Sequence, residues 1–154
     1  MSTPPTRFSL APRILAATLE HKGPYDRIGE GVVALKSWMA KKKLKPAGNP
    51  FALYYDNPEG RDPAELRSEV CIPVESAFAS TKKVKFKEFP QTEVAETRHL
   101  GPPEEFAKTY GPFLEWLLGN GFEIVGPARE FYDKVSKKMG PGSGILIQQP
   151  IRKK

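Results

Sequence analysis

A carboxylate and a tyrosine two residues apart, Glu130 and Tyr132, are the side chains of this sequence best suited to chemistry. Strand alternation places both on one face and Phe131 on the other. Removing a carboxylate from water costs several kcal/mol unless it is paired or its pKa rises. We therefore predict that Glu130 binds a cationic ligand or activates a water molecule as a general base, with Tyr132 and Trp116 orienting the substrate or stabilising developing positive charge. The alternative is a solvated surface ion pair with Arg129, Arg98 or a lysine.

Aromatic side chains could line an apolar pocket around this carboxylate and stack flat or cationic ligands. They are Trp38, Trp116, Tyr54, Tyr55, Tyr110 and Tyr132. Each tryptophan lies at the edge of an apolar helical stripe, where it either walls a cleft or caps the core. Glu69 is a second acidic candidate for ligand binding, with Arg67 on the same strand face to pair with it.

The histidines and the single cysteine favour structural roles. His21 and His99 precede Gly-Pro steps without an accompanying ligand pattern, so we expect strand-end histidines and no metal site. Cys71 lies in an apolar run and is expected to be a small buried core residue. No Ser-His-Asp order, phosphate loop or dinucleotide fingerprint occurs, so no cofactor is predicted.

An internal repeat positions these groups. Residues 21–24, His-Lys-Gly-Pro, recur at 99–102 as His-Leu-Gly-Pro, an offset of 78 positions (99 − 21). The same offset relates Trp38 to Trp116, Leu35 to Phe113 and Tyr54 to Tyr132, and near the end the register slips by one residue. It carries Ala52 onto Glu130, so the carboxylate stands where one copy departs from the other.

Each half is predicted to run strand, helix, strand, strand. The first strands are residues 13–20 and 83–99, and the later ones are 51–55, 69–74, 129–132 and 144–151. Period-3.6 stripes predict the helices: Ile28, Val32, Leu35 and Met39 in one, Phe106, Tyr110, Phe113 and Leu117 in the other. The result is an α+β fold of duplicated β-α-β-β units with pseudo-twofold symmetry, an antiparallel sheet, two main helices and a central ligand groove.

Length predicts a single domain over residues 1–154. Repeat one covers about 7–75, a linker about 76–82, repeat two about 83–151, and a basic tail 152–154. The formal net charge of +6 comes from lysine clusters that suit a helix end, a strand surface and this tail, so no direct nucleic-acid binding is expected. Without a membrane-length apolar run, a signal peptide or a second cysteine, the protein is predicted to be cytoplasmic.

Several segments together resemble the GyrI-like (gyrase-inhibitor-like) effector-binding domain family, found alone and behind the DNA-binding domains of bacterial transcription regulators. They are FALYYDNP at 51–58, RSEVCIPV at 67–74, RHLGP at 98–102 and EFY at 130–132. The resemblance spans about residues 7–151 and implies a groove for hydrophobic, often cationic or planar, compounds, as in multidrug binding. It maps a groove glutamate onto Glu130 and aromatic walls onto Tyr132 and Trp116.

The resemblance leaves three functions open. A stand-alone module that binds a small organic ligand ranks first, and a hydrolase of strained cyclopropanoid toxins, with Glu130 activating water, ranks second. A protein-directed modulator, of DNA gyrase or of a transcription regulator, ranks third. Only about a dozen residues precede the first predicted strand, so a regulator would need a partner protein. Pro103 stands where the family has a tyrosine.

Overall fold

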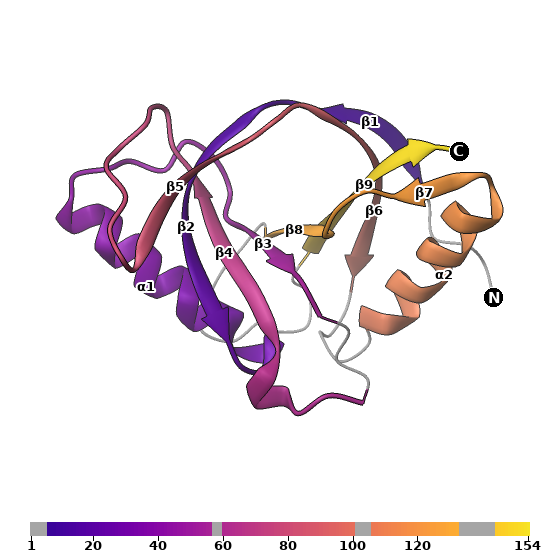
Figure 1. Cartoon of the computed structure of the whole chain (residues 1–154), viewed down its shortest axis with the longest axis horizontal. Coiled ribbons are helices and arrows are strands. Elements are labelled where there is room, and N and C mark those ends of the chain that lie inside the picture. Colours follow the sequence, from indigo (N-terminus) through magenta and orange to yellow (C-terminus); the bar gives the residue numbers. More distant parts are fainter. Residues whose placement is uncertain (1–5, 57–59, 101–105, 133–143) are drawn as a thin grey trace.

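The computed structural model describes residues 6–56, 60–100, 106–132 and 144–154. Its strands and helices follow one another along the chain as shown in Figure 1. They are β1 (Arg7–Ala11), β2 (Ile14–Lys22), η1 (Tyr25–Arg27), α1 (Ile28–Lys41), β3 (Phe51–Tyr54), η2 (Pro63–Glu65), β4 (Arg67–Pro73), β5 (Val84–Phe89), β6 (Thr92–Leu100), α2 (Phe106–Gly119), β7 (Phe122–Ile124), β8 (Arg129–Tyr132) and β9 (Gly144–Lys153). The η elements are short 3₁₀ helices.

The strand order shows the duplication directly. The sheet runs β1-β6-β9-β8-β3-β4-β2-β5, and all of these neighbours are antiparallel. Exchanging the halves, β1 for β5, β2 for β6, β3 for β8 and β4 for β9, turns this order into its own reverse. The predicted antiparallel α+β fold with pseudo-twofold symmetry is therefore confirmed. Strand β7 pairs only with β9, at the side of this path.

In each half the structure has two strands where the sequence predicts one, and the second half also contains β7, which was not predicted. The segment 83–99, predicted as one strand, is two strands, β5 and β6, and β1 precedes β2 in the same way. Pro12 and Pro90 stand at these breaks, where proline lacks the N–H that a continuous ladder needs. The extra strands are exchanged, because β1 pairs with β6 of the second half and β5 pairs with β2 of the first. Figure 1 shows both crossings in the arch at the top of the molecule.

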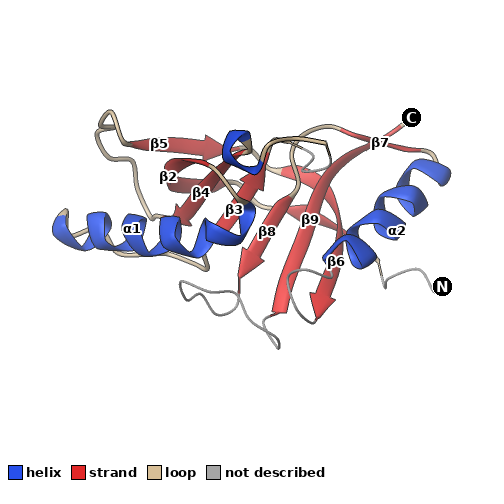
Figure 2. Ribbon diagram, turned by 90° about the horizontal axis from the view of Figure 1, so that it is seen from below, coloured by secondary structure: helices blue, strands red, loops and turns tan. Residues whose placement is uncertain are grey.

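Both helices contribute to one apolar cluster on one face of the sheet. Helix α1 buries the predicted stripe of Ile28, Val32, Leu35 and Met39. Helix α2 buries Phe113 and Leu117, while the side chain of Phe106 lies outside the described residues. Figure 2 shows the helices at opposite ends of the sheet, with β3 and β8 between them.

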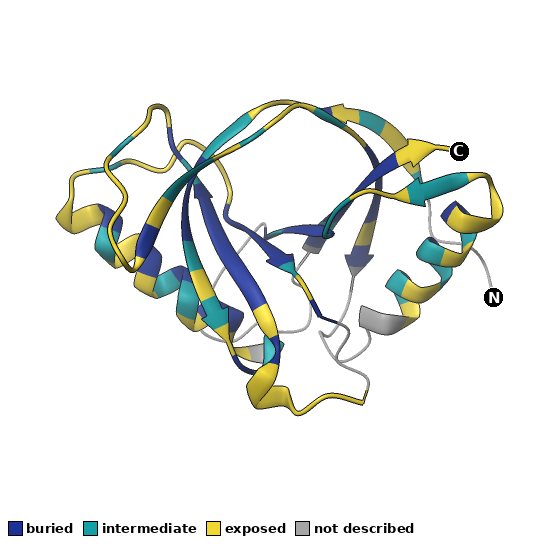
Figure 3. Ribbon diagram, viewed as in Figure 1, coloured by how far each residue is buried: buried dark blue, intermediate teal, exposed yellow. Residues whose placement is uncertain are grey.

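The opposite face of the sheet has its own apolar cluster. It consists of Ala16, Phe51, Leu53 and Cys71, with Ile14, Phe89 and Phe131 packed against it. Cys71 is fully buried, as expected, and burial raises the pKa of its thiol. Figure 3 shows how far the central strands β3, β4 and β8 are buried, which leaves their polar side chains little access to water. None of the described helices is long and apolar enough to span a bilayer.

Candidate ligand site on the pseudo-twofold axis

The symmetry axis passes between Ala52 and Glu130. In the β3–β8 pair, Ala52 lies opposite Glu130, Phe51 opposite Phe131 and Leu53 opposite Arg129. Ala52 and Glu130 are also repeat equivalents, and two equivalent residues can face each other only where the twofold axis runs between them. The residue that breaks the repeat therefore lies at the centre of the molecule.

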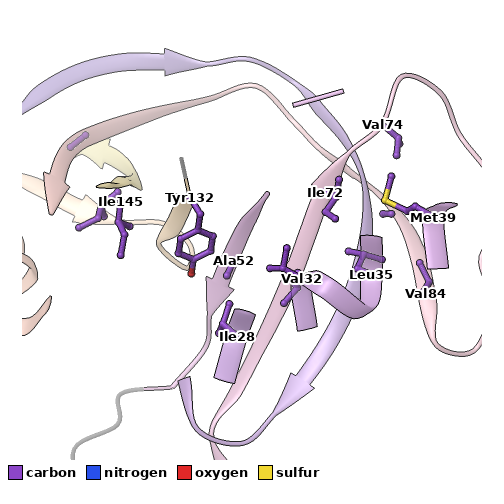
Figure 4. Packing of buried hydrophobic residues seen from close by; sticks show 14 of the residues in the cluster. Ile28, Val32, Leu35, Met39, Ala52, Ile72, Val74, Val84, Tyr132 and Ile145 are labelled. Carbon is purple, nitrogen blue, oxygen red and sulfur yellow. The ribbon is translucent and has the colours of Figure 1, made fainter. Parts of the chain in front are cut away.

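Glu130 and Tyr132 are buried side by side on the helix face, as strand alternation predicted. Their exposed fractions are 7% and 2%, so both are withdrawn from solvent. The Tyr132 hydroxyl donates to Glu130 Oε1 at 3.5 Å, and it is also hydrogen-bonded to the hydroxyl of Tyr54. Figure 4 shows Tyr132 between Ala52 of the first half and Ile145 of the second.

The Glu130 carboxyl has no cationic partner among the described residues. Arg129 points to the opposite face, so the predicted alternative of a solvated ion pair with it does not hold. Burial raises the pKa of Glu130 to about 8, while hydrogen bonds from Tyr54 and Tyr132 act in the other direction. At neutral pH this carboxyl is therefore mainly protonated.

Tyrosine hydroxyls are hydrogen-bonded to this carboxyl. Burial, followed by the charge of Glu130, raises the pKa of Tyr132 and of Tyr54 well above the ordinary value, so both remain donors. Burial first, then the Glu130 charge, raises the pKa of Tyr110 to about 12. The Tyr110 hydroxyl donates to Gln149 Oε1 at 2.9 Å, which fixes its position on α2. Three predicted site tyrosines thus gather around one carboxyl.

Tyr25 is a member of this group that the sequence did not identify. Its ring packs edge-to-face with that of Tyr54, at a centroid distance of 4.6 Å. Its hydroxyl lies 2.9 Å from the carbonyl oxygens of Asp56 and Arg67, which anchors the ring. The sequence feature that could have identified Tyr25 is a difference between the repeats after the Gly-Pro step, where one half has Tyr25 and the other has Pro103. Pro103 lies outside the described residues.

The two tryptophans lie at the far ends of the helices. Figure 4 shows the buried residues of α1, with Ile28 near Ala52 and Tyr132 and Met39 at the opposite end of the helix. Trp38 immediately precedes Met39 in the sequence, so it lies at the end of α1 away from Tyr132. The Trp38 ring packs 5.7 Å from Phe78, and the Trp116 ring packs 5.8 Å from Phe8 of the edge strand β1. Of the two roles considered for them, these contacts support capping the core.

Glu69 is not brought together with Glu130. It faces the opposite side of the sheet beside Leu53, and it is only 2% exposed. Its oxygens accept hydrogen bonds from the Tyr55 hydroxyl at 2.7 Å and from Lys87 Nζ at 2.6 Å. The predicted partner, Arg67, instead binds Asp56 at 3.0 Å. Glu69 and Tyr55 therefore belong to a separate polar cluster.

The histidines tie strand ends to the segments that follow them. His21 Nε2 lies 3.2 Å from the Pro24 carbonyl oxygen, and His99 Nδ1 lies 2.9 Å from the Thr109 hydroxyl of α2. These contacts give both residues a structural role. In the ranges that the structure describes, no three histidine, cysteine or acidic side chains cluster in a way that could hold a metal ion.

Solved structures of other proteins share this fold over nearly its whole length. The C-terminal domain of EcmrR superimposes with a TM-score of 0.81 at 18% identity, covering 98% of this chain and 99% of that one. A structure solved with bound tetraphenylphosphonium matches with a TM-score of 0.58 at 12% identity, over 96% and 95% of the two chains. "DNA gyrase inhibitor 2" of Dickeya dadantii (strain 3937) is 27% identical over 127 residues, 80% of this chain and 78% of that protein.

The family model for the GyrI-like small molecule binding domain matches residues 5–141, nearly the whole of the duplicated fold. This agrees with the resemblance carried by the segments around Tyr54, Glu69, His99 and Glu130. The chain belongs to the GyrI-like small molecule binding domain family.

Proposed function

We propose that this domain binds amphipathic organic cations on its pseudo-twofold axis, with Glu130 as the counter-charge. The observation that carries the proposal is a buried carboxyl with tyrosine hydroxyls, and no described cation, around it. An ionised carboxylate in such surroundings is unfavourable unless a positive charge arrives. A bound cation supplies that charge and stabilises the ionised form.

Tyrosine rings suit the rest of such a ligand. Tyr132, Tyr54 and Tyr110 belong to or pack against the apolar cluster of this face, and tyrosine rings attract cations and bury apolar substituents. The helices cover the two ends of this sheet face and leave β3 and β8 between them, which is where we expect the groove. The relative with bound tetraphenylphosphonium supports a lipophilic cation as the ligand class.

The test is a calorimetric titration with tetraphenylphosphonium at pH 8.5. Wild type is expected to bind, and Glu130→Gln, which keeps the shape but removes the charge, is expected to bind at least tenfold more weakly. Glu69→Gln is the matched control, because it removes a buried carboxylate from the opposite face and should change the affinity less than twofold. Equal binding by wild type and Glu130→Gln, or no binding by wild type, would contradict the proposal.

A second candidate function is hydrolysis, favoured by the pKa of about 8 at Glu130. A general base works best when its pKa lies near the working pH. In this reaction the water oxygen bonds to a ring carbon of a strained cyclopropane, the adjacent carbon–carbon bond breaks, and Glu130 passes the water proton to the released carbon. Mass spectrometry of an electrophilic cyclopropane incubated with the protein should show the mass of one added water, and Glu130→Gln should abolish it. An unchanged substrate mass would exclude hydrolysis and leave binding.

A third candidate, inhibition of DNA gyrase, is motivated by the 27% identical relative. A gyrase supercoiling assay with increasing amounts of the purified protein tests it. Loss of supercoiling at stoichiometric protein would support it, and unchanged supercoiling would remove it.

A further inference from the structure

Arg129 is a buried cation on the face of the sheet opposite Glu130. It precedes Glu130 on β8, so its side chain points the other way, toward the cluster of Phe51, Leu53 and Cys71. Its exposed fraction is 6%. A guanidinium always carries its charge in proteins. Because Arg129 is buried beside an apolar cluster, its positive charge lies in a largely apolar environment.

No carboxylate of the described chain neutralises Arg129. Its guanidinium lies 5.5 Å from the ring centroid of Phe89, a cation–π contact, and its Nη1 has no hydrogen-bond partner. Burial lowers the pKa of this group, with only the Cys71 thiol acting against the shift. Two acidic side chains of this face are paired with other cations, Glu69 with Lys87 and Glu96 with Arg7.

A second unpaired atom lies next to it in the sheet. Gln148 of β9 is opposite Arg129, and its Nε2 donates to Glu96 at 2.7 Å. The Gln148 Oε1 is buried and unpaired, like Arg129 Nη1. A water molecule between the two could satisfy both atoms, but it would leave the positive charge of Arg129 without a counter-charge.

Arg129 is part of the wall of a hollow of about 420 Å³, a volume typical of small-molecule sites. Tyr55 and Phe89 line one part, and Val125 and Pro150 line another. Tyr55 and Val125 are 45% and 41% exposed, large fractions for side chains of this size and polarity. The hollow therefore combines apolar walls, rim residues open to solvent and one buried positive charge.

The equivalent position in the first half of the chain shows which side chain is enough to pack the sheet where Arg129 lies. The repeat equivalent of Arg129 is Phe51, which is fully buried between the rings of Phe89 at 5.6 Å and Phe131 at 4.8 Å. Packing alone is satisfied by an aromatic ring there. A guanidinium in the equivalent position adds a charge that contacts the Phe89 ring but has no counter-charge among the described residues.

We propose that the hollow beside Arg129 is a second ligand site, for a small organic carboxylate with a flat apolar body. The carboxylate pairs with the Arg129 guanidinium, and the body lies against Tyr55, Phe89 and Val125. The fold would then hold two sites on opposite faces of one strand, one for a cation at Glu130 and one for an anion at Arg129. This site does not depend on the function proposed for Glu130.

The test uses 2-naphthoate and its neutral analogue 2-naphthamide in calorimetric titrations of the full chain at pH 7.5. Wild type is expected to bind the carboxylate at least tenfold more tightly than the amide. Arg129→Met, which keeps most of the volume and removes the charge, should lose at least tenfold in 2-naphthoate affinity, and Arg129→Lys should retain part of it. Glu130→Gln should change that affinity less than twofold, and tetraphenylphosphonium should not compete.

Equal affinities for the carboxylate and the amide, or an unchanged 2-naphthoate affinity in a folded Arg129→Met, would overturn the proposal. If Arg129→Met does not fold, the carboxylate–amide comparison in wild type and the Arg129→Lys titration decide. A crystal structure with 6-bromo-2-naphthoate provides an independent measurement. Anomalous bromine density in the hollow beside Arg129 supports the site, and density at another place contradicts it.

Discussion

The hydroxyl groups of Tyr54 and Tyr132 are hydrogen-bonded to each other, although the two residues lie 78 positions apart in the chain. Each is the repeat equivalent of the other, so their contact lies on the pseudo-twofold axis. Glu130 accepts from the Tyr132 hydroxyl but has only Ala52 as its equivalent. Under the function that we propose, a ligand on the axis meets two matched tyrosines and a single carboxyl, and this one charge sets the orientation of the bound cation.

The stability of the protein should fall as the pH rises, because of Glu130. Its pKa is about 8 in the folded chain, against an ordinary value of about 4.5, so the folded state holds a proton that the unfolded state has lost between these pH values. Raising the pH through this window favours unfolding, by about 3 kcal/mol between pH 5 and pH 8. Glu130→Gln should lack this contribution. Urea denaturation of both proteins at pH 5 and pH 8 measures it, and parallel pH dependences would contradict a buried, protonated carboxyl.

A second carboxylate on the axis should make folding strongly pH-dependent. Ala52→Glu places a carboxyl directly opposite Glu130, where two negative charges cannot both be ionised in an apolar environment. We expect the variant to fold at pH 5 and to lose several kcal/mol of stability relative to wild type at pH 8.5. Ala52→Gln adds the same volume without the charge, and its stability should change between these pH values only as much as that of wild type. Equal behaviour of the two variants would show that Ala52 and Glu130 do not face each other.

The tyrosine hydroxyls should lower the pKa of the Glu130 carboxyl and so strengthen cation binding. Hydrogen bonds from Tyr54 and Tyr132 lower the pKa of Glu130, so Tyr132→Phe should raise it and make ionisation harder. One such bond contributes about 1 kcal/mol, so tetraphenylphosphonium affinity at pH 7 should fall roughly fivefold. Tyr55→Phe is the control on the opposite face and should bind as wild type does. A larger loss in Tyr55→Phe than in Tyr132→Phe would place the ligand elsewhere.

The duplication and the special position of Glu130 could be predicted because both are visible in one alignment of the chain with itself. An offset that matches Trp38 with Trp116 and Tyr54 with Tyr132 also isolates the one place where alanine meets glutamate. Alternation along residues 129–132 then predicted correctly which neighbours share the face of Glu130. These features depend on local pattern and on comparison of the halves.

Features that depend on the partner half could not be predicted in the same way. Strand β1 is only five residues long and pairs with β6, about 85 positions away. No local sequence pattern therefore predicts this strand. Arg129 lies in a basic chain where most arginines are exposed, and its burial follows from Phe89 and Val125, which other strands and loops bring to it. The same holds for Tyr25, whose ring reaches Tyr54 through a turn.

The most direct test of the account is the number of protons released when tetraphenylphosphonium binds. Calorimetric titration in two buffers of different ionisation enthalpy gives this number. With a Glu130 pKa of about 8, wild type should release about 0.9 protons per cation at pH 7 and about 0.1 at pH 9, and Glu130→Gln should release none. Binding at pH 7 without proton release, or with the same release from Glu130→Gln, would contradict a cation paired with this carboxyl.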